Sequence, residues 1–218
     1  MLKYQCLVFD HDDTVVRSAQ TVNYPHFRQF LRQLRPNQDL SFRDYMLLSA
    51  DPGYHEMCRS VFGFNEAEMD AMFLDWKSYV KSHIPEPFAG IGQIIRRQKA
   101  EGGIVCVSSH SSVETIRRDW QRNFAILPDQ IYSWELGDGR RKPAPFALED
   151  IMRRYALQPA ELVMIDDLRP GYQMARACGV DFIAAGWSHP YEELRRIMQE
   201  HCDYYLKTVA QLEKFLFA

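Results

Sequence analysis

Short apolar runs alternate with amphipathic segments over most of the chain. Apolar runs that are too short for helices and are bounded by polar or turn residues predict buried strands. These runs are residues 4–9, 104–107, 130–134, 162–165 and 181–185. Segments with apolar residues at helical spacing lie at residues 91–101, 111–124, 145–155, 170–178, 191–201 and 208–217. Strands that alternate with helices predict an α/β fold with a parallel sheet, right-handed crossovers and helices on both faces.

The stretch between the first two predicted strands has a different pattern. Its apolar and aromatic residues follow helical spacing, and turn residues separate the predicted helices 25–34, 42–48, 54–62 and 66–82. Asn65 is a candidate N-cap for the last of these helices. One face of that helix carries Met69, Met72, Phe73, Trp76 and Val80. We interpret this face as part of the small core of an inserted helical block, and not as a cofactor site.

This change of pattern predicts two domains. Residues 1–16 and 88–218 would form the α/β core, and residues 17–87 would form an all-helical insertion. The chain crosses between them twice, the second time through the proline- and glycine-rich segment 85–92. Two adjacent linkers are typical of a hinge, so we expect the insertion to close over a ligand.

Composition and charge exclude several classes of protein. The chain has 218 residues, is 46% hydrophobic and carries a net charge of −3 with both signs interspersed. It can therefore bury a sizeable core, and no global field favours nucleic acid or an anionic membrane as a partner. Five scattered cysteines without a C-x-x-C pair argue against a disulfide framework and a zinc site. No stretch approaches about 18 apolar residues, so we expect a cytoplasmic protein, with its oligomeric state left open.

Polar side chains follow three of the predicted strands. They are Asp10 to Thr14, the pair Ser108 and Ser109, and the pair Asp166 and Asp167. In open α/β sheets, ligands bind beyond the carboxyl ends of the strands. Lys142 precedes another predicted helix, where backbone N–H groups also favour anions. This coincidence predicts a functional site at that edge of the sheet.

Asp10 and Asp12 are spaced to point the same way from an extended backbone. Two carboxylates so close repel each other unless a cation lies between them, and hard oxygen ligands suit Mg²⁺. The alternative for this segment alone is an acidic turn after a strand. Together, the acidic segment after the first strand, the serines, Lys142 and the second acid pair supply the groups that phosphoryl transfer through an aspartyl-phosphate requires.

Four motifs in this order resemble those of the haloacid dehalogenase superfamily of phosphohydrolases. The motifs are Phe9-Asp10-His11-Asp12-Asp13-Thr14-Val15, Ile104 to Ser108, Lys142-Pro143-x-Pro145 and Leu162 to Asp167. The resemblance implies a Rossmann-like core, and the helical block resembles the cap of the phosphoglycolate phosphatase and β-phosphoglucomutase branch. That branch acts mainly on small phosphorylated metabolites, so the resemblance implies such a substrate and Mg²⁺ as cofactor.

The resemblance also implies a role for each site residue. Asp10 would be the nucleophile, and Asp12 would protonate the leaving oxygen and then activate water. Ser108 would bind a phosphoryl oxygen, with Ser109 beside it, and Lys142 would hold Asp10 and the phosphate together.

Metal binding is implied for Asp10, for Asp12 through its backbone carbonyl, and for Asp166. The family's second acid usually stands where this chain has Pro170, so we expect Asp167 to substitute as an outer ligand.

Asp13 stands where the family usually has glycine. Aspartate tolerates unusual backbone angles, and we expect its side chain to turn away from the phosphate. We interpret His11 and His110 as neighbours of the site and not as catalysts. Tyr54, His55 and Arg59 are weaker candidates for substrate contacts in the insertion.

Several alternatives compete with a phosphatase. A phosphomutase of the β-phosphoglucomutase type would use the same Asp12, and the sequence does not separate the two. A dehalogenase is less favoured, because its reaction has no leaving oxygen for Asp12 to protonate. A phospho-accepting receiver module is shorter and has no helical insertion, and no G-x-G-x-x-G motif supports a nucleotide-binding oxidoreductase.

Overall fold

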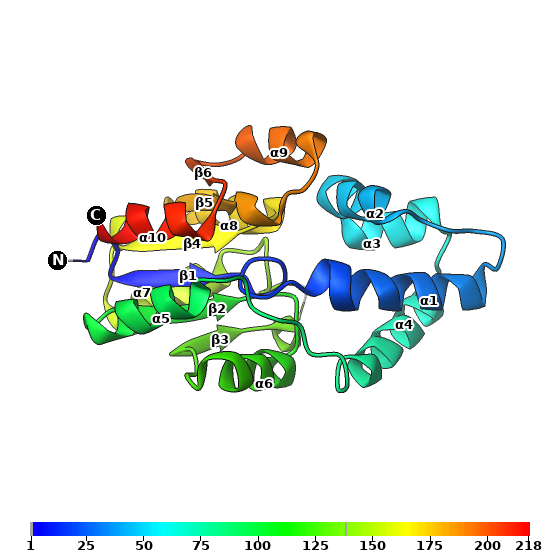
Figure 1. Cartoon of the computed structure of the whole chain (residues 1–218), viewed down its shortest axis with the longest axis horizontal. Coiled ribbons are helices and arrows are strands. Elements are labelled where there is room, and N and C mark those ends of the chain that lie inside the picture. Colours follow the sequence, from blue (N-terminus) through cyan, green and yellow to red (C-terminus); the bar gives the residue numbers. More distant parts are fainter. Residues whose placement is uncertain (1, 138) are drawn as a thin grey trace. The chain divides into compact units, whose positions relative to one another are not determined.

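The computed structural model describes residues 2–137 and 139–218. The chain divides into two compact units, one made of Met1–Arg17 and Glu86–Ala218 and the other of Ser18–Pro85. Figure 1 shows the first as strands with helices around them and the second as helices. The assignment of these units as core and cap domains stays a prediction.

The first unit contains a six-stranded sheet in which every strand pair is parallel. Its strands are β1 (Cys6–Phe9), β2 (Ile104–Ser108), β3 (Gln130–Tyr132), β4 (Leu162–Asp166), β5 (Asp181–Ala185) and β6 (Tyr204–Leu206). Their order is β3-β2-β1-β4-β5-β6. Phe9 pairs with Val107 on one side and Ile165 on the other, so β1, β2 and β4 end at the same edge. The predicted α/β fold class is confirmed.

Helices cover both faces of this sheet (Figure 1). Leu7 and Phe9 of β1 share a buried cluster with residues of α5, α6 and α10. Helix α8 packs on β4 and β5 and contacts α7, on the opposite face. The helices are α5 (Ile91–Ala100), α6 (Val113–Phe124), α7 (Phe146–Tyr155), α8 (Arg169–Cys178), α9 (Glu192–Gln199) and α10 (Val209–Phe217). Because both faces are covered, the central strands β1, β2 and β4 are apolar up to the polar residues Ser108 and Asp166 that end β2 and β4.

Strand β6 is missing from the sequence-based interpretation. It has three residues, all at least partly exposed, and so lacks the buried apolar run that marks the other strands. Its place at the sheet edge is set by backbone pairing with β5 and by Asp203, whose carboxylate accepts a hydrogen bond from the Phe182 N–H at 2.8 Å. Strand β3 is also shorter than predicted, because the chain turns at Ser133 into a short 3₁₀ helix.

The second unit is helical. It contains α1 (Tyr24–Leu34), α2 (Phe42–Leu48), α3 (Tyr54–Glu56) and α4 (Glu66–Tyr79), with π-helical turns at Ala19–Asn23, Ser49–Gly53 and Met57–Val61. Asn65 caps α4 as predicted, and its side chain and that of Glu68 bond each other's backbone N–H groups. The predicted helix 54–62 is instead α3 followed by a π-helical turn.

An aromatic cluster forms the core of this helical unit. The Phe27 ring of α1 lies 5.5 to 5.9 Å from the rings of Phe62, Tyr45 and Tyr54. Helix α4 contributes buried Met69 and Met72, but its Phe73 and Trp76 are only partly buried. The prediction that this face of α4 forms part of the core is therefore confirmed for the two methionines, whereas the two aromatic side chains are buried only in part.

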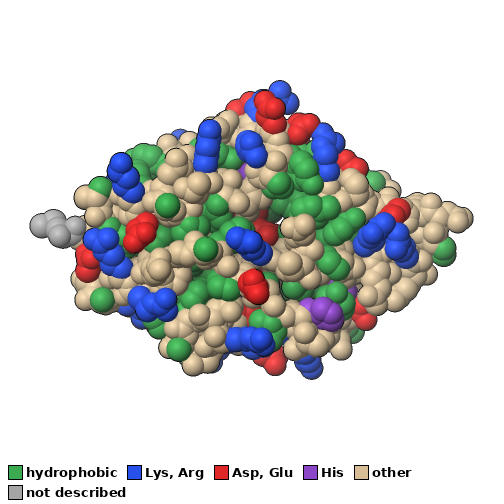
Figure 2. Space-filling view, viewed as in Figure 1, with side chains coloured by type: hydrophobic (Ala, Val, Ile, Leu, Met, Phe, Trp, Pro, Cys, Tyr) green, Lys and Arg blue, Asp and Glu red, His purple; other side chains and the backbone are tan. Residues whose placement is uncertain are grey.

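Within the described residues, none of the helices has both the length and the apolar character needed to span a membrane. On the face that Figure 2 presents, basic and acidic side chains are interspersed.

Candidate active site

Backbone hydrogen bonds within the loop after β1 hold it in a tight turn. Asp10 is buried at the strand end, and its N–H donates to the carbonyl of Ile165 on β4 at 2.8 Å. The carbonyl of His11 accepts from the N–H groups of Val15 and Val16. Asp13 has a φ of 55°, a left-handed conformation that aspartate adopts more readily than most residues. This explains how the loop forms without the glycine usual at this position.

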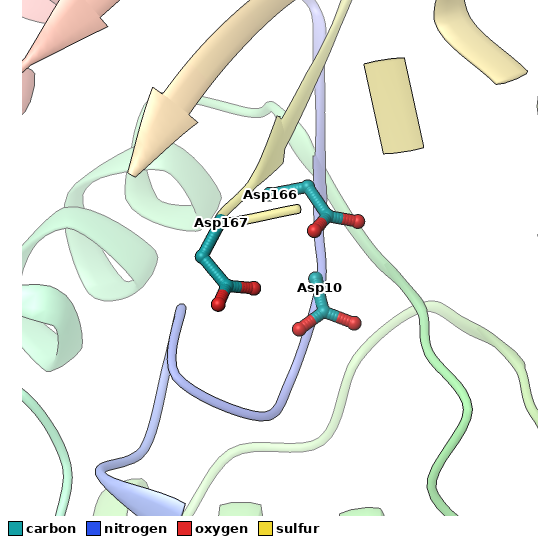
Figure 3. A group of neighbouring side chains, drawn as sticks. All are labelled: Asp10, Asp166 and Asp167. Carbon is teal, nitrogen blue, oxygen red and sulfur yellow. The ribbon is translucent and has the colours of Figure 1, made fainter. Parts of the chain in front are cut away.

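Three buried carboxylates meet at the ends of β1 and β4. Asp10, Asp166 and Asp167 each place an oxygen within 4.8 Å of the others, and Figure 3 shows the three side chains near one another. Asp166 is further held by the N–H of Leu168, which donates to its Oδ1 at 2.9 Å. Asp167, which we expected as an outer ligand, thus belongs to the same group of buried carboxylates as Asp10 and Asp166.

Lys142 reaches this group from the loop before α7. Its buried ammonium donates to Oδ1 of Asp10 at 2.7 Å and to Oδ2 of Asp166 at 2.5 Å. Burial opposes the charged form of Lys142, but the two carboxylates raise its pKa above the ordinary value. Lys142 is therefore a fixed positive charge between two of the three acids.

One lysine does not balance this much negative charge. Burial raises the pKa of Asp10 to about 7, with repulsion from Asp166 and Asp12 adding to the effect and Lys142 opposing it. Burial and the charges of Asp166, Asp10 and Asp13 raise the pKa of Asp167 well above its usual range. Asp13, although half-buried and expected to turn away, acts on the site through its charge.

These carboxylates fit a divalent cation. The group offers three hard oxygen donors in a buried setting, and their mutual repulsion favours an additional positive charge. This is the donor chemistry that Mg²⁺ prefers.

The carboxylate of Asp12 is not part of that group. Its Oδ2 accepts a hydrogen bond of 2.5 Å from the hydroxyl of Ser111, a residue that the sequence motifs did not indicate. The expected sharing of one cation by the Asp10 and Asp12 carboxylates stays a prediction. The implied use of the Asp12 backbone carbonyl stays a prediction.

The two serines at the end of β2 are buried beside the site. The Ser108 hydroxyl lies 3.9 Å from the sulfur of Met174 on α8. The Ser109 N–H donates to the carbonyl of Tyr132 at 2.9 Å, and its hydroxyl accepts from the Ser111 N–H at 3.2 Å. Their roles in phosphate binding stay predictions.

Both histidines beside the motifs have specific partners. His11 is fully buried and lies 3.1 Å from the carboxylate of Asp119 on α6, while His110 donates from Nε2 to the carbonyl of Lys142 at 2.9 Å. The sequence motifs did not indicate Asp119. The helical spacing of Ile116, Asp119 and Trp120 is a sequence feature that could have indicated it, because it places Asp119 on the apolar face of α6, where the structure buries it.

The loop after β5 forms hydrogen bonds to both acidic loops, and no sequence motif indicated these contacts. His189 donates from Nε2 to the carbonyl of Asp167 at 2.8 Å, and the Trp187 indole donates to the carbonyl of Thr14 at 3.1 Å. Burial lowers the pKa of His189 to about 4, so its ring is neutral and its Nδ1 accepts from the Tyr205 hydroxyl. The strand ends are therefore fixed by side chains from a third segment.

Comparison with known proteins identifies the family of the chain and proteins with a similar fold. The family model described as haloacid dehalogenase-like hydrolase matches residues 7–185. A predicted phosphoglycolate phosphatase from Haemophilus somnus is similar over 99% of both chains, with 15% identity and a TM-score of 0.76. A mutant form of CbbY from Rhodobacter sphaeroides, in complex with xylulose-(1,5)bisphosphate, is similar over 96% of both chains, with 17% identity and a TM-score of 0.73.

A haloacid dehalogenase-like family hydrolase from Streptococcus pneumoniae is similar over 98% of both chains, with 13% identity and a TM-score of 0.75. A search of curated proteins finds no match. At identities this low the solved structures establish a shared fold, while the family model covers most of the chain and confirms the family that the four motifs predicted.

Proposed function

Because the chain belongs to the haloacid dehalogenase-like hydrolase family, we propose that it is a Mg²⁺-dependent phosphatase acting on a small phosphorylated metabolite. The observation that carries the proposal is the buried contact of Lys142 with Asp10 and Asp166, next to the third carboxylate of Asp167. These contacts support the proposal because the residues that we assign as nucleophile, cation and metal ligands lie together at one edge of the sheet.

In the first half of the reaction, a carboxylate oxygen of Asp10 attacks the phosphorus of the ester. A bond forms between that oxygen and phosphorus, and the bond from phosphorus to the leaving oxygen breaks. Asp12 in its acid form gives its proton to the leaving oxygen, which departs as an alcohol. The Lys142 ammonium, already 2.7 Å from Asp10, keeps the nucleophile in place and offsets the charge of the phosphoryl group.

In the second half, Asp12 accepts a proton from water while the water oxygen attacks phosphorus. The bond between phosphorus and Asp10 breaks, which restores the Asp10 carboxylate and releases inorganic phosphate. The same Asp12 then holds the proton needed for the next turnover. The cycle therefore needs the Asp12 carboxylate close to Asp10 but not bound to the metal, and this carboxylate is not among the clustered acids Asp10, Asp166 and Asp167.

Asp10, Asp166 and Asp167 are the side chains that would hold Mg²⁺. When bound, the ion supplies positive charge that stabilises the transferring phosphoryl oxygens. The ligand of the CbbY complex, a phosphorylated sugar, is an example of the substrate class that we propose here.

Hydrolysis of p-nitrophenyl phosphate by the purified protein tests this function. We expect phosphate release that requires Mg²⁺ and stops in excess EDTA. Asp10→Asn should abolish turnover, because an amide is a poor nucleophile. Asp70→Asn makes the same chemical change at an exposed position of α4 and should leave the rate unchanged. Wild-type activity in Asp10→Asn, or full activity in EDTA, would contradict the proposal.

A further inference from the structure

We propose that Ser111 is a positioning residue that orients the Asp12 carboxylate for proton transfer, an inference that rests on the proposed phosphatase function. The Ser111 hydroxyl donates to Oδ2 of Asp12 at 2.5 Å across 99 residues of sequence. Ser111 lies in the loop between β2 and α6, whereas Asp12 lies in the loop after β1. The contact thus joins two loops at the edge of the sheet where the site lies.

Hydrogen bonds of its own backbone and of the next residue fix the position of Ser111. Its N–H donates to the Ser109 hydroxyl at 3.2 Å, and its carbonyl accepts from the Trp134 N–H at 3.0 Å. The next residue, Ser112, caps α6 by accepting from the N–H of Thr115. Ser111 is only 2% exposed, and its backbone is bonded at both its N–H and its carbonyl, so the position from which the hydroxyl reaches Asp12 is fixed.

A second link joins the same two parts of the chain. His11, the residue between the two proposed catalytic acids, pairs with Asp119 of α6 at 3.1 Å, and both side chains are fully buried. Asp119 is also bonded by Arg118, which donates from Nε at 2.8 Å. Helix α6 and the loop that precedes it therefore hold the loop after β1 at two successive residues.

This arrangement suits the work proposed for Asp12. A hydroxyl bonded to Oδ2 fixes the rotation of the carboxylate, so its second oxygen also has a set direction. General acid catalysis requires the proton donor within hydrogen-bond reach of the reacting oxygen. General acid catalysis by Asp12 matters most when the leaving group is a poor one, because a stable leaving anion departs without protonation.

The first test compares esters that differ in their leaving group. The rate constant kcat/KM is measured with Mg²⁺ for p-nitrophenyl phosphate, phenyl phosphate and glycerol phosphate, in the wild type, Ser111→Ala, Ser111→Thr and Ser112→Ala. We expect Ser111→Ala to lose on the order of tenfold more activity on glycerol phosphate than on p-nitrophenyl phosphate. Ser111→Thr keeps the hydroxyl and should restore the wild-type pattern.

Ser112→Ala is the matched control, since it removes a neighbouring buried hydroxyl that contacts Thr115 and caps α6. It should change all three rates by one common factor. The same common factor in Ser111→Ala would show a purely structural role and overturn the inference while leaving the proposed function in place.

The second test does not depend on activity. The unfolding equilibrium in urea is measured for Ser111→Ala, Asp12→Ala and the double variant. A charge-assisted hydrogen bond predicts a coupling of about tenfold in the unfolding constant, and additive effects would contradict the contact. If the wild type hydrolyses none of the esters, the proposed function fails and the positioning role fails with it, even where the coupling is present.

Discussion

The ammonium of Lys142 lies 2.7 Å from the carboxylate of Asp10, although 132 residues separate them in the sequence. Both side chains are buried, and the same ammonium contacts Asp166. A buried charge is tolerated when it is paired and strongly destabilising when its partner is removed. The contact is therefore central both to the stability of the first unit and to the proposed chemistry.

Lys142→Met should lower the free energy of unfolding by about 3–5 kcal/mol in EDTA, because Asp10 and Asp166 would then be buried without a cation. Urea unfolding measures the change. The control is Lys99→Met, which removes a partly exposed partner of Asp129 at 2.7 Å and should cost about 0–1 kcal/mol. Equal losses in the two variants would show that the Lys142 contacts contribute no more than an exposed ion pair.

The location of the site could be predicted because it depends on local patterns. The apolar runs before Asp10, Ser108 and Asp166 indicated parallel strands, and parallel strands place their carboxyl ends at one edge. The left-handed conformation of Asp13 and the cap at Asn65 also follow from residue type.

Contacts set by packing could not be predicted in the same way. The Ser111 hydroxyl reaches Asp12 because the loop before α6 lies against the loop after β1 in the folded chain. His189 reaches Asp167 only because the loop after β5 turns back toward β4. Neither contact has a sequence spacing that would reveal it.

The helical unit should become less stable in mild acid because of His26. Its ring is buried and contacts the rings of Phe30 and Tyr79, and its Nε2 lies 2.9 Å from the carboxylate of Asp75. Burial lowers the pKa of His26, and the charge of Asp75 only partly opposes this. The unfolded chain therefore binds the proton more readily, so stability is lost as the pH falls through about 6.5.

An NMR titration of the His26 ring should give a midpoint below the ordinary histidine pKa of about 6.5. His26→Gln should reduce the loss of thermal stability between about pH 7 and pH 5. A His26 midpoint at or above about 6.5 would contradict the effect of burial.

Gly171 is the position in α8 where a side chain would disturb the proposed metal site most directly. A Cβ built there would overlap the carboxylate of Asp166, which also accepts from Lys142. Gly171→Ala should therefore displace Asp166, and the rise in thermal midpoint that Mg²⁺ gives the wild type should be reduced or lost.

Gly139→Ala is the control. At Gly139 a Cβ meets nothing within 4 Å, so Gly139→Ala should keep the full Mg²⁺ response. A full response in Gly171→Ala would mean that Asp166 can shift without loss of binding, which would argue against its assignment as a metal ligand.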